Sequence, residues 1–283
     1  MKTARSLAAL ATSIVAGALL FALSPVSAQT GGVVSVLYAG SLVTPMEGPI
    51  KSALASKGID FQGQGAGSKQ LANFIASGIK NPDIFISVDP KLVVGLGPKV
   101  ASAETFAGTS LGLGWSDKSK YASLFENVAA GKTTALSALQ TPGLKIGRTD
   151  PKLDPKGEYT VDAVKMLAGA NGEQQILGPD ENTMQTFPEE DLLARVDVGE
   201  ADVGFFYKTE AVARGLRFAA LPGAAAMSDK ITYTIAVMKA APHPDQAKTF
   251  ENFIVTGDGK AILEKAGIEY LPTPRVLSSP STP

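Results

Sequence analysis

Two serines stand where strand-like segments give way to helical ones. Ser41 follows the apolar, β-branched segment 33–39, and Ser68 follows a second segment that starts at Ile59. A hydroxyl beside the free backbone N–H groups of a helix start forms a neutral receptor for an anion. Serine at this position is also a common helix cap that binds only its own backbone. Because open α/β sheets bind ligands at the carboxyl ends of their strands, two such serines favour an anion site.

The elements that would hold these serines alternate between strand and helix. Apolar periodicity predicts strands at 33–39, 59–62, 83–88, 145–148, 203–207 and 231–238, and helices at 69–77, 159–168, 189–198, 244–255 and 259–266. Residues 63–67 are predicted to form a glycine-rich turn. This alternation is typical of parallel sheets covered by helices.

The pattern predicts an α/β protein with the two-lobed periplasmic binding protein fold and a hinged cleft between the lobes. The alternation is interrupted by extended segments near Leu111 and Tyr233, where the chain would pass between lobes. We expect lobe I to contain residues 29–112 and 232–275, and lobe II residues 113–231. The Pro- and Ser-rich segment 271–283 is expected to pack loosely, with a flexible tail at 276–283.

The first residues have the order of a secretory signal peptide. Lys2 and Arg5 precede the apolar run 7–23, and Val26-Ser27-Ala28 precedes Gln29. We expect residues 1–28 to be removed and the protein to be exported to the periplasm. An uncleaved membrane anchor is the alternative. The absence of cysteine excludes disulfides, a thiolate metal site and lipid attachment through cysteine.

The charge balance argues against a polyanionic partner. The 26 Lys and Arg side chains include Lys2 and Arg5, so that 24 remain against 27 Asp and Glu, a formal charge of −3. No Lys/Arg cluster provides the basic face that nucleic acid requires. An anionic ligand must therefore be held mainly by neutral donors.

Five short segments occur in an order that is informative. They are YAGSL at 38–42, GS at 67–68, PDIFISVD at 82–89, GRTDPKLDPKG at 147–157 and VGFFYKTEA at 203–211. In this order they resemble the molybdate- and tungstate-binding proteins of ABC importers. The resemblance covers most of the chain between Val33 and Ile268.

The resemblance implies the residues of the site. In that family two serine hydroxyls with their amides, two amides of the second lobe and often a tyrosine hydroxyl hold the anion. The corresponding positions here are Ser41, Ser68, the amides near Lys156 and Leu192, and Tyr207. Ser41, Ser68 and Tyr207 would meet the metal centre only through the oxygens of the oxyanion.

One branch of the family adds two carboxylates that extend the coordination of the metal. Asp154 matches the first of them, whereas Phe206 occupies the position of the second. Without the second carboxylate, a four-coordinate oxyanion is expected rather than a six-coordinate metal centre. The implied partners are the oxyanion and the membrane subunits of an ABC importer. We expect a monomer that has no cofactor and is not an enzyme.

Other functions remain open at this point. Sulfate or phosphate could use the same donors, and ferric iron could be bound by Tyr38, Tyr159 and Tyr207. A secreted serine hydrolase would use Ser110, within Gly108-Thr109-Ser110-Leu111-Gly112, together with the single histidine, His243. The glycines at 63, 65 and 67 resemble a dinucleotide loop but lack a glycine at position 68.

Overall fold

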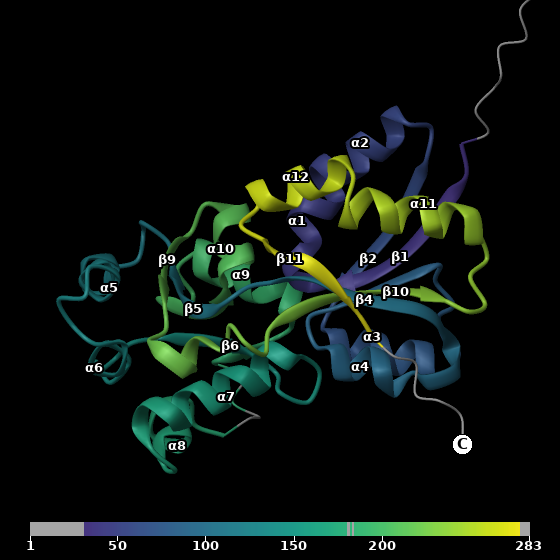
Figure 1. Ribbon diagram of the computed structural model, residues 1–283. Helices are drawn as coiled ribbons and strands as arrows, with labels where there is room; N and C mark the ends of the chain where they lie inside the picture. Colours follow the sequence, from purple (N-terminus) through teal and green to yellow (C-terminus); the bar gives the residue numbers. More distant parts are fainter. Residues whose placement is uncertain (1–30, 180–181, 183, 278–283) are drawn as a thin grey trace, which may run out of the picture. The chain divides into compact units, whose positions relative to one another are not determined.

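Two β-sheets organise residues 31–179, 182 and 184–277, the part of the chain that this computed structural model describes (Figure 1). These residues belong to one unit, Gly31–Pro283. The predicted signal peptide, residues 1–28, lies outside the described residues. No helix among the described residues combines the length and the apolar character that crossing a membrane would require.

Sheet A has six strands and sheet B has five. The order in sheet A is β11 (Glu269–Val276), β4 (Val100–Gly108), β10 (Thr232–Met238), β3 (Ile84–Ser87), β1 (Val33–Ala39) and β2 (Asp60–Ala66). The order in sheet B is β7 (Thr186–Phe187), β6 (Ile146–Thr149), β8 (Val203–Tyr207), β5 (Leu111–Trp115) and β9 (Arg217–Ala220).

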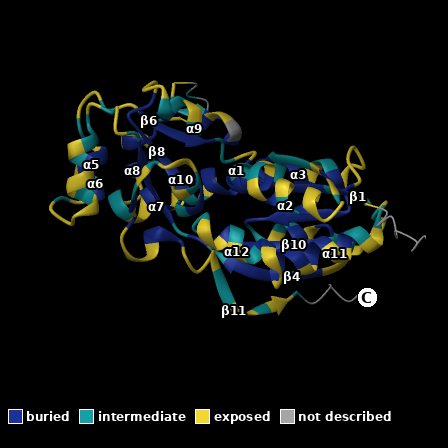
Figure 2. Cartoon of the chain, turned by 90° about the horizontal axis from the view of Figure 1, so that it is seen from above, coloured by how far each residue is buried: buried dark blue, intermediate teal, exposed yellow. Residues whose placement is uncertain are grey.

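The helices lie against both faces of these sheets (Figures 1 and 2). The α-helices are α1 (Val43–Pro45), α2 (Lys51–Ser56), α3 (Ser68–Ala76), α4 (Pro90–Gly95), α5 (Ala122–Ala129), α6 (Ala135–Leu139), α7 (Pro155–Ala168), α8 (Gly172–Ile176), α9 (Glu189–Asp197), α10 (Lys208–Arg214), α11 (Pro244–Val255) and α12 (Asp258–Lys265). Short turns of other types are η1 (Gly40–Leu42), the π-helical η2 (Met46–Ile50), η3 (Gly97–Lys99) and η4 (Gly223–Ala226).

Strand β1 shows why sheet A needs helices on both sides. Val34, Val36 and Tyr38 join a large core cluster that also contains Phe250 of α11. Leu37, which points to the other face, packs in a second cluster with residues of α3 and α4. A strand that is buried on both faces is apolar along its length, and this explains the near-continuous apolar sequence of β1.

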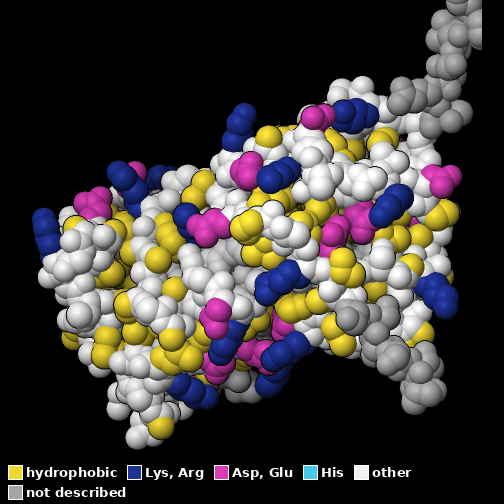
Figure 3. All heavy atoms as spheres, viewed as in Figure 1, with side chains coloured by type: hydrophobic (Ala, Val, Ile, Leu, Met, Phe, Trp, Pro, Cys, Tyr) yellow, Lys and Arg dark blue, Asp and Glu magenta, His cyan; other side chains and the backbone are white. Residues whose placement is uncertain are grey.

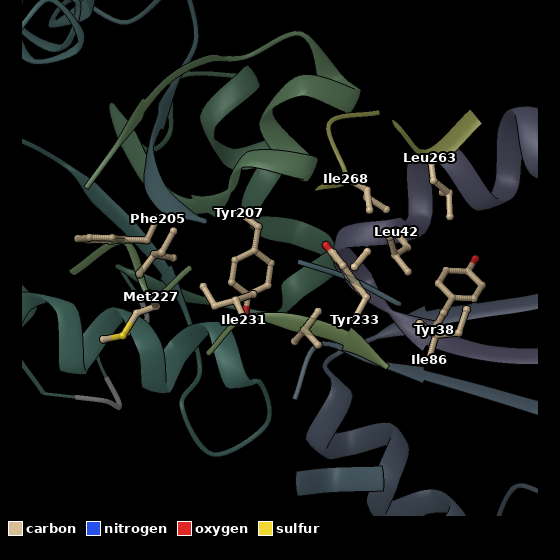
Figure 4. Packing of buried hydrophobic residues seen from close by; sticks show 14 of the residues in the cluster. Tyr38, Leu42, Ile86, Phe205, Tyr207, Met227, Ile231, Tyr233, Leu263 and Ile268 are labelled. Carbon is tan, nitrogen blue, oxygen red and sulfur yellow. The ribbon is translucent and has the colours of Figure 1, made fainter. Parts of the chain in front are cut away.

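The chain passes from sheet A to sheet B through Thr109 and Ser110, between β4 and β5, and it returns before β10. The two passages touch, because the amide of Thr109 donates to the carbonyl of Ile231 at 3.2 Å. One apolar cluster continues across them, from Phe205 and Tyr207 of sheet B to Ile231 and Tyr233 (Figure 4). The α/β, two-lobed architecture predicted from the sequence is therefore confirmed.

Several elements differ from the prediction. Residues 63–66 belong to strand β2 rather than to a glycine-rich turn. The segment after residue 270, which the sequence predicts to pack loosely, continues strand β11, which pairs with β4, and the amide of Leu277 donates to the carbonyl of Ala103. Most side chains of this segment stay exposed. Val276 is thus part of a strand and not of a tail. Strand β5 begins at Leu111 in sheet B, two residues before the expected lobe boundary.

Candidate functional site

Two Gly–Ser turns lie side by side at the carboxyl edge of sheet A. Ala39 of β1 pairs in register with Ala66 of β2, so the turns that follow, Gly40-Ser41 and Gly67-Ser68, start next to each other. Both serines are buried, with 3% and 1% of their surface exposed. The sequence therefore places two hydroxyls together at the edge where a ligand is expected.

Neither serine caps its own helix. The residue at the cap position is Ala39 before η1 and Gly67 before α3, and neither helix start has a side-chain capping bond. Instead, the Ser41 hydroxyl lies 3.0 Å from the hydroxyl of Tyr233, and the Ser68 hydroxyl accepts weakly from the amide of Val88 at 3.4 Å. The ordinary capping role that the sequence left open is thus excluded for both.

Sheet B presents its own carboxyl edge to the same region. Strands β6 and β8 are parallel; Asp154 and Lys156 follow the end of β6, and Tyr207 is the last residue of β8. Only two residues join the end of β4 in sheet A to the start of β5 in sheet B. The start of β5 pairs with the end of β8, so the carboxyl edges of the two sheets face each other. Tyr207 is 1% exposed, Asp154 is 3% exposed and Lys156 is fully buried.

The two Gly–Ser turns are in direct contact with lobe II. A Cβ atom at Gly67 would lie 2.6 Å from the carbonyl oxygen of Leu153 and 3.2 Å from Cβ of Asp154. A Cβ atom at Gly40 would collide with Cγ of Glu189. The amide of Gln70, in the first turn of α3, also donates to the Leu153 carbonyl at 3.2 Å. At Gly67 the backbones of the two lobes approach closely, whereas at Gly40 an added atom would meet the buried side chain of Glu189.

A small cavity of about 140 Å³ lies at this seam. Its lining includes Gly67, Asp154 and Glu189. A larger and more open cavity of about 980 Å³ is lined by Asp89, Tyr159 and other residues, but by none of Ser41, Ser68 or Tyr207. Ser41, Ser68 and Tyr207 do not line the smaller cavity either, but we assign the site to it because Gly67, the neighbour of Ser68, lines it together with Asp154 and Glu189.

The charged centre of the site is an ammonium group between two carboxylates. Lys156 Nζ donates to Glu210 at 2.5 Å and to Glu189 at 3.0 Å. It also lies 5.5 Å from the ring centres of Phe206 and Tyr207. Although burial opposes the charged form, the neighbouring carboxylates, Glu189 first, raise the pKa of Lys156 above its usual value. Desolvation works against ionisation of Glu189 too, but Lys156 more than offsets it and lowers the pKa of Glu189 to about 2.

Three buried oxygens next to this ion pair have no hydrogen-bond partner: Asp154 Oδ2, Glu189 Oε2 and the Tyr207 hydroxyl. Asp154 and Glu189 lie close enough to shift each other's pKa, so a protonated Asp154 can donate to Glu189. Because buried polar atoms are almost always paired, the Tyr207 hydroxyl is the oxygen that is left for a ligand to complete. Burial, followed by the charge of Glu189, raises the pKa of Asp154 well above its usual value. Burial likewise raises the pKa of Tyr207. Both shifts favour the protonated forms, which donate hydrogen bonds.

Leu192 and Phe206, both named from the sequence, lie in the protein core. The amide of Leu192 donates to the carbonyl of Pro188 inside helix α9, and the side chain packs against Gly147 in the core. Leu192 is therefore not available to a ligand. Helix α9 begins at Glu189, so its free amides lie about one turn earlier than expected. Phe206 is fully buried and supplies no carboxylate.

The amide of Lys156 lies in the first turn of α7, where backbone N–H groups have no acceptor within the helix. The side chain of Lys156, which the sequence interpretation did not use, forms the ion pair with Glu189 and Glu210. Glu210 also accepts from the amide of Tyr207 at 3.0 Å and so fixes the start of α10. Glu189, Glu210 and Tyr233 are site residues that sequence reasoning missed. The signal for Glu210 was its position three residues after Tyr207, which is typical of a helix-start acid.

The geometry rejects the hydrolase hypothesis. His243 bonds to Asp83, which also accepts from the amide of Ser35 near the start of β1. Ser110 follows the end of β4, and the strand register places that end beside the carboxyl ends of β1 and β3. Ser110 and His243 are therefore at opposite edges of sheet A and cannot act together.

The iron hypothesis is not supported either. The Tyr38 hydroxyl donates to Glu47 at 2.6 Å, so it is not free to bind a metal together with Tyr159 and Tyr207. Burial raises the pKa of all three, which disfavours the phenolate that iron needs. Within the described residues, no cluster of three His, Cys, Asp or Glu side chains is placed to hold a metal ion.

Known proteins resemble this chain in sequence and in fold. The chain is 29% identical over 196 residues to a putative ABC transporter molybdenum-binding protein of Haloferax volcanii, a match covering 69% of this chain and 62% of that protein. It is 28% identical over 256 residues to the molybdate-binding protein ModA of Escherichia coli, covering 88% and 94%. The periplasmic molybdate-binding protein of Azotobacter vinelandii superposes with a TM-score of 0.67 at 18% identity, covering 85% and 100%.

The chain thus spans somewhat less than two thirds of the Haloferax protein and nearly the whole of the Escherichia coli protein. Residues 34–269 match the model of the bacterial extracellular solute-binding proteins. This match covers sheet B, the strands of sheet A other than β11, and the seam between the sheets. The expectation drawn from the five sequence segments is confirmed at this level. The chain belongs to the family of bacterial extracellular solute-binding proteins.

Proposed function

We propose that this chain is a periplasmic substrate-binding protein that captures molybdate or tungstate and delivers it to an ABC importer. The observation that carries the proposal is the pair of buried Gly–Ser turns, whose hydroxyls do not cap their helices and which meet lobe II beside the orphaned Tyr207 hydroxyl. The names of the Haloferax and Escherichia coli relatives, which specify molybdenum and molybdate, support the choice of ligand.

The donors of the proposed site are nearly all neutral. Ser41, Ser68 and Tyr207 offer hydroxyls, and the first turns of α3, α7 and α9 offer amides. Lys156, the one buried ammonium among the described residues, is already paired with Glu189 and Glu210 and would not hold the anion directly. Such a site suits a tetrahedral oxyanion, whose oxygens accept several hydrogen bonds at once.

The remaining features of the proposal follow from this role. The protein would act without a cofactor, as a monomer, and without catalysis. Its other partners would be the membrane subunits of the importer. On the face shown in Figure 3, Lys and Arg side chains alternate with Asp and Glu, which fits a protein whose partner is not nucleic acid. The coordination would be four-coordinate, because Phe206 offers no second carboxylate.

Retention of molybdenum by the purified protein, after incubation with molybdate, tests the proposal. The protein would be unfolded, dialysed free of anions, refolded and incubated with an equal amount of molybdate before gel filtration. Elemental analysis should find about one molybdenum per chain in the protein fraction. The Ser41→Ala/Ser68→Ala double variant should retain almost none, whereas Ser110→Ala, which changes a residue outside the site, should retain as much as the parent. Equal retention by the double variant would reject the site.

A further inference from the structure

Tyr233 is fully buried at the start of β10, and its hydroxyl lies 3.0 Å from that of Ser41. Figure 4 shows its ring between Tyr207 of sheet B and Leu42, which follows Ser41. Tyr233 lies outside the five sequence segments that resemble the family, and it lines neither of the two cavities described above. It nevertheless touches one of the two serines on which the proposed site depends.

Burial raises the pKa of Tyr233, and the nearby hydroxyls of Ser41 and Thr209, the latter in the first turn of α10, act against this rise. The hydroxyl of Thr209 donates to Thr109 Oγ1 at 3.0 Å. Thr109 also accepts from the amide of Thr209 at 3.4 Å. Four buried hydroxyls therefore form a row, in the order Ser41, Tyr233, Thr209 and Thr109, with one hydrogen bond within the first pair and one within the second. The row ends where the polypeptide passes from sheet A to sheet B.

The single proton of the Ser41 hydroxyl limits the hydrogen bonds that Ser41 can donate. A serine hydroxyl has one proton, and an anion that accepts from Ser41 uses it. The contact between Ser41 and Tyr233 then remains a hydrogen bond only if the Tyr233 hydroxyl donates to Ser41 Oγ. In the absence of an anion, Ser41 can instead donate to Tyr233, because either hydroxyl can be the donor of this bond. Anion binding would thus reverse the direction of the hydrogen bond without moving a heavy atom.

We infer that Tyr233 is a positioning residue of the anion site, whose hydroxyl donates to Ser41 and directs the Ser41 proton at the bound oxyanion. This inference rests on the proposed function. A hydroxyl that receives a hydrogen bond is a stronger donor, because hydrogen bonds in a chain polarise one another.

The test is a double-mutant cycle with molybdate as the probe, measured by calorimetric titration. Tyr233→Phe keeps the ring and should weaken binding about tenfold, as expected for one lost hydrogen bond. In a Ser41→Ala background the same change should alter the affinity by less than about twofold, because the bond it removes is already absent. A purely structural role would instead lower the affinity by the same factor in both backgrounds, and this result would overturn the inference.

The control is Tyr270→Phe, which removes another partly buried hydroxyl from sheet A. That hydroxyl donates to the carbonyl of Ile254 at 2.6 Å, away from the site. Tyr270→Phe should lower the unfolding temperature of the anion-free protein and leave the affinity unchanged. An affinity of Tyr233→Phe equal to that of the parent would also refute the inference.

Thr209→Val provides a second variant if Tyr233→Phe does not fold. It removes the hydroxyl behind Tyr233, and it should weaken binding about two- to threefold in the parent background and not in the Ser41→Ala background. An unchanged affinity would refute the inference. If the parent binds no oxyanion, the proposed function and this inference are both overturned. If the parent binds molybdate but the effects of the two substitutions simply add, the inference alone is overturned.

Discussion

Replacement of Gly67 by alanine should weaken anion binding without destabilising the protein. The backbone at Gly67 has φ of −54° and ψ of 128°, a conformation open to any residue. The added methyl group would lie 2.6 Å from the carbonyl oxygen of Leu153, which is backbone and cannot turn aside. The collision is between lobe I and lobe II, so it occurs only when the two lobes are closed.

The expected size follows from this geometry. A contact of 2.6 Å must open by several tenths of an ångström, and overpacking of this kind costs about 1–3 kcal/mol. The affinity for molybdate should therefore fall about five- to hundredfold. In the anion-free protein the lobes can separate, and alanine restricts the unfolded chain, so the unfolding free energy should be equal or up to about 1 kcal/mol higher.

Titration calorimetry and thermal unfolding measure the two effects separately. The matched control is Gly95→Ala, in helix α4, where an added Cβ has no neighbour within 4 Å. The control should leave the affinity unchanged. The reasoning is wrong if Gly67→Ala binds molybdate as tightly as the control does, or if it loses affinity only in proportion to lost stability.

Three further predictions concern single side chains. Ser41→Ala and Ser68→Ala should each weaken molybdate binding at least tenfold in calorimetric titration, because each removes a charge-assisted hydrogen bond of about 1.5–3 kcal/mol. Lys156→Met should lower the unfolding free energy in urea by about 3–5 kcal/mol, because it leaves buried Glu189 and Glu210 uncompensated. Lys57→Met, which breaks the exposed pair with Asp258, should change it by less than about 1 kcal/mol, and equal losses would contradict the account. Since Lys156 holds the pKa of Glu189 near 2 against an ordinary 4.5, the stabilisation is present above pH 4.5 and is lost as the pH falls toward 2. Glu189→Gln should remove part of that acid-dependent loss in unfolding curves recorded between these pH values, and an unchanged profile would contradict the assignment.

Local sequence patterns were sufficient to predict the strands that lie at the centre of the sheets. Strands β1 and β8 match the predicted residues because both are short, apolar and bounded by residues that end a strand. Strands β4 and β11 were missed, because β4 has a polar and exposed first half and β11 contains Pro272 and Pro274. Such edge-type sequences become strands through tertiary pairing rather than through their own periodicity.

The site was predictable only where a motif marked it. Ser41, Ser68, Asp154, Lys156 and Tyr207 lie on the turns that the motifs identify, and the structure places them at the two facing edges. The position of Leu192 was inferred from the start of a helix alone, and an error of one turn was enough to exchange a free amide for a bonded one. Glu189 and Tyr233 reach the site from distant parts of the chain, and no local pattern records that contact.

The selectivity of the refolded, anion-free protein tests the central claim most directly. Calorimetric titration with molybdate, tungstate, sulfate and phosphate compares anions that differ in size and in protonation. A cleft fixed for the larger oxyanions leaves donors unpaired around sulfate, at about 1–3 kcal/mol each. The account predicts submicromolar binding of both molybdate and tungstate, with sulfate and phosphate at least about a hundredfold weaker, a difference of about 2.8 kcal/mol. Binding of sulfate or phosphate as tight as that of molybdate, or no binding of any oxyanion, would contradict it.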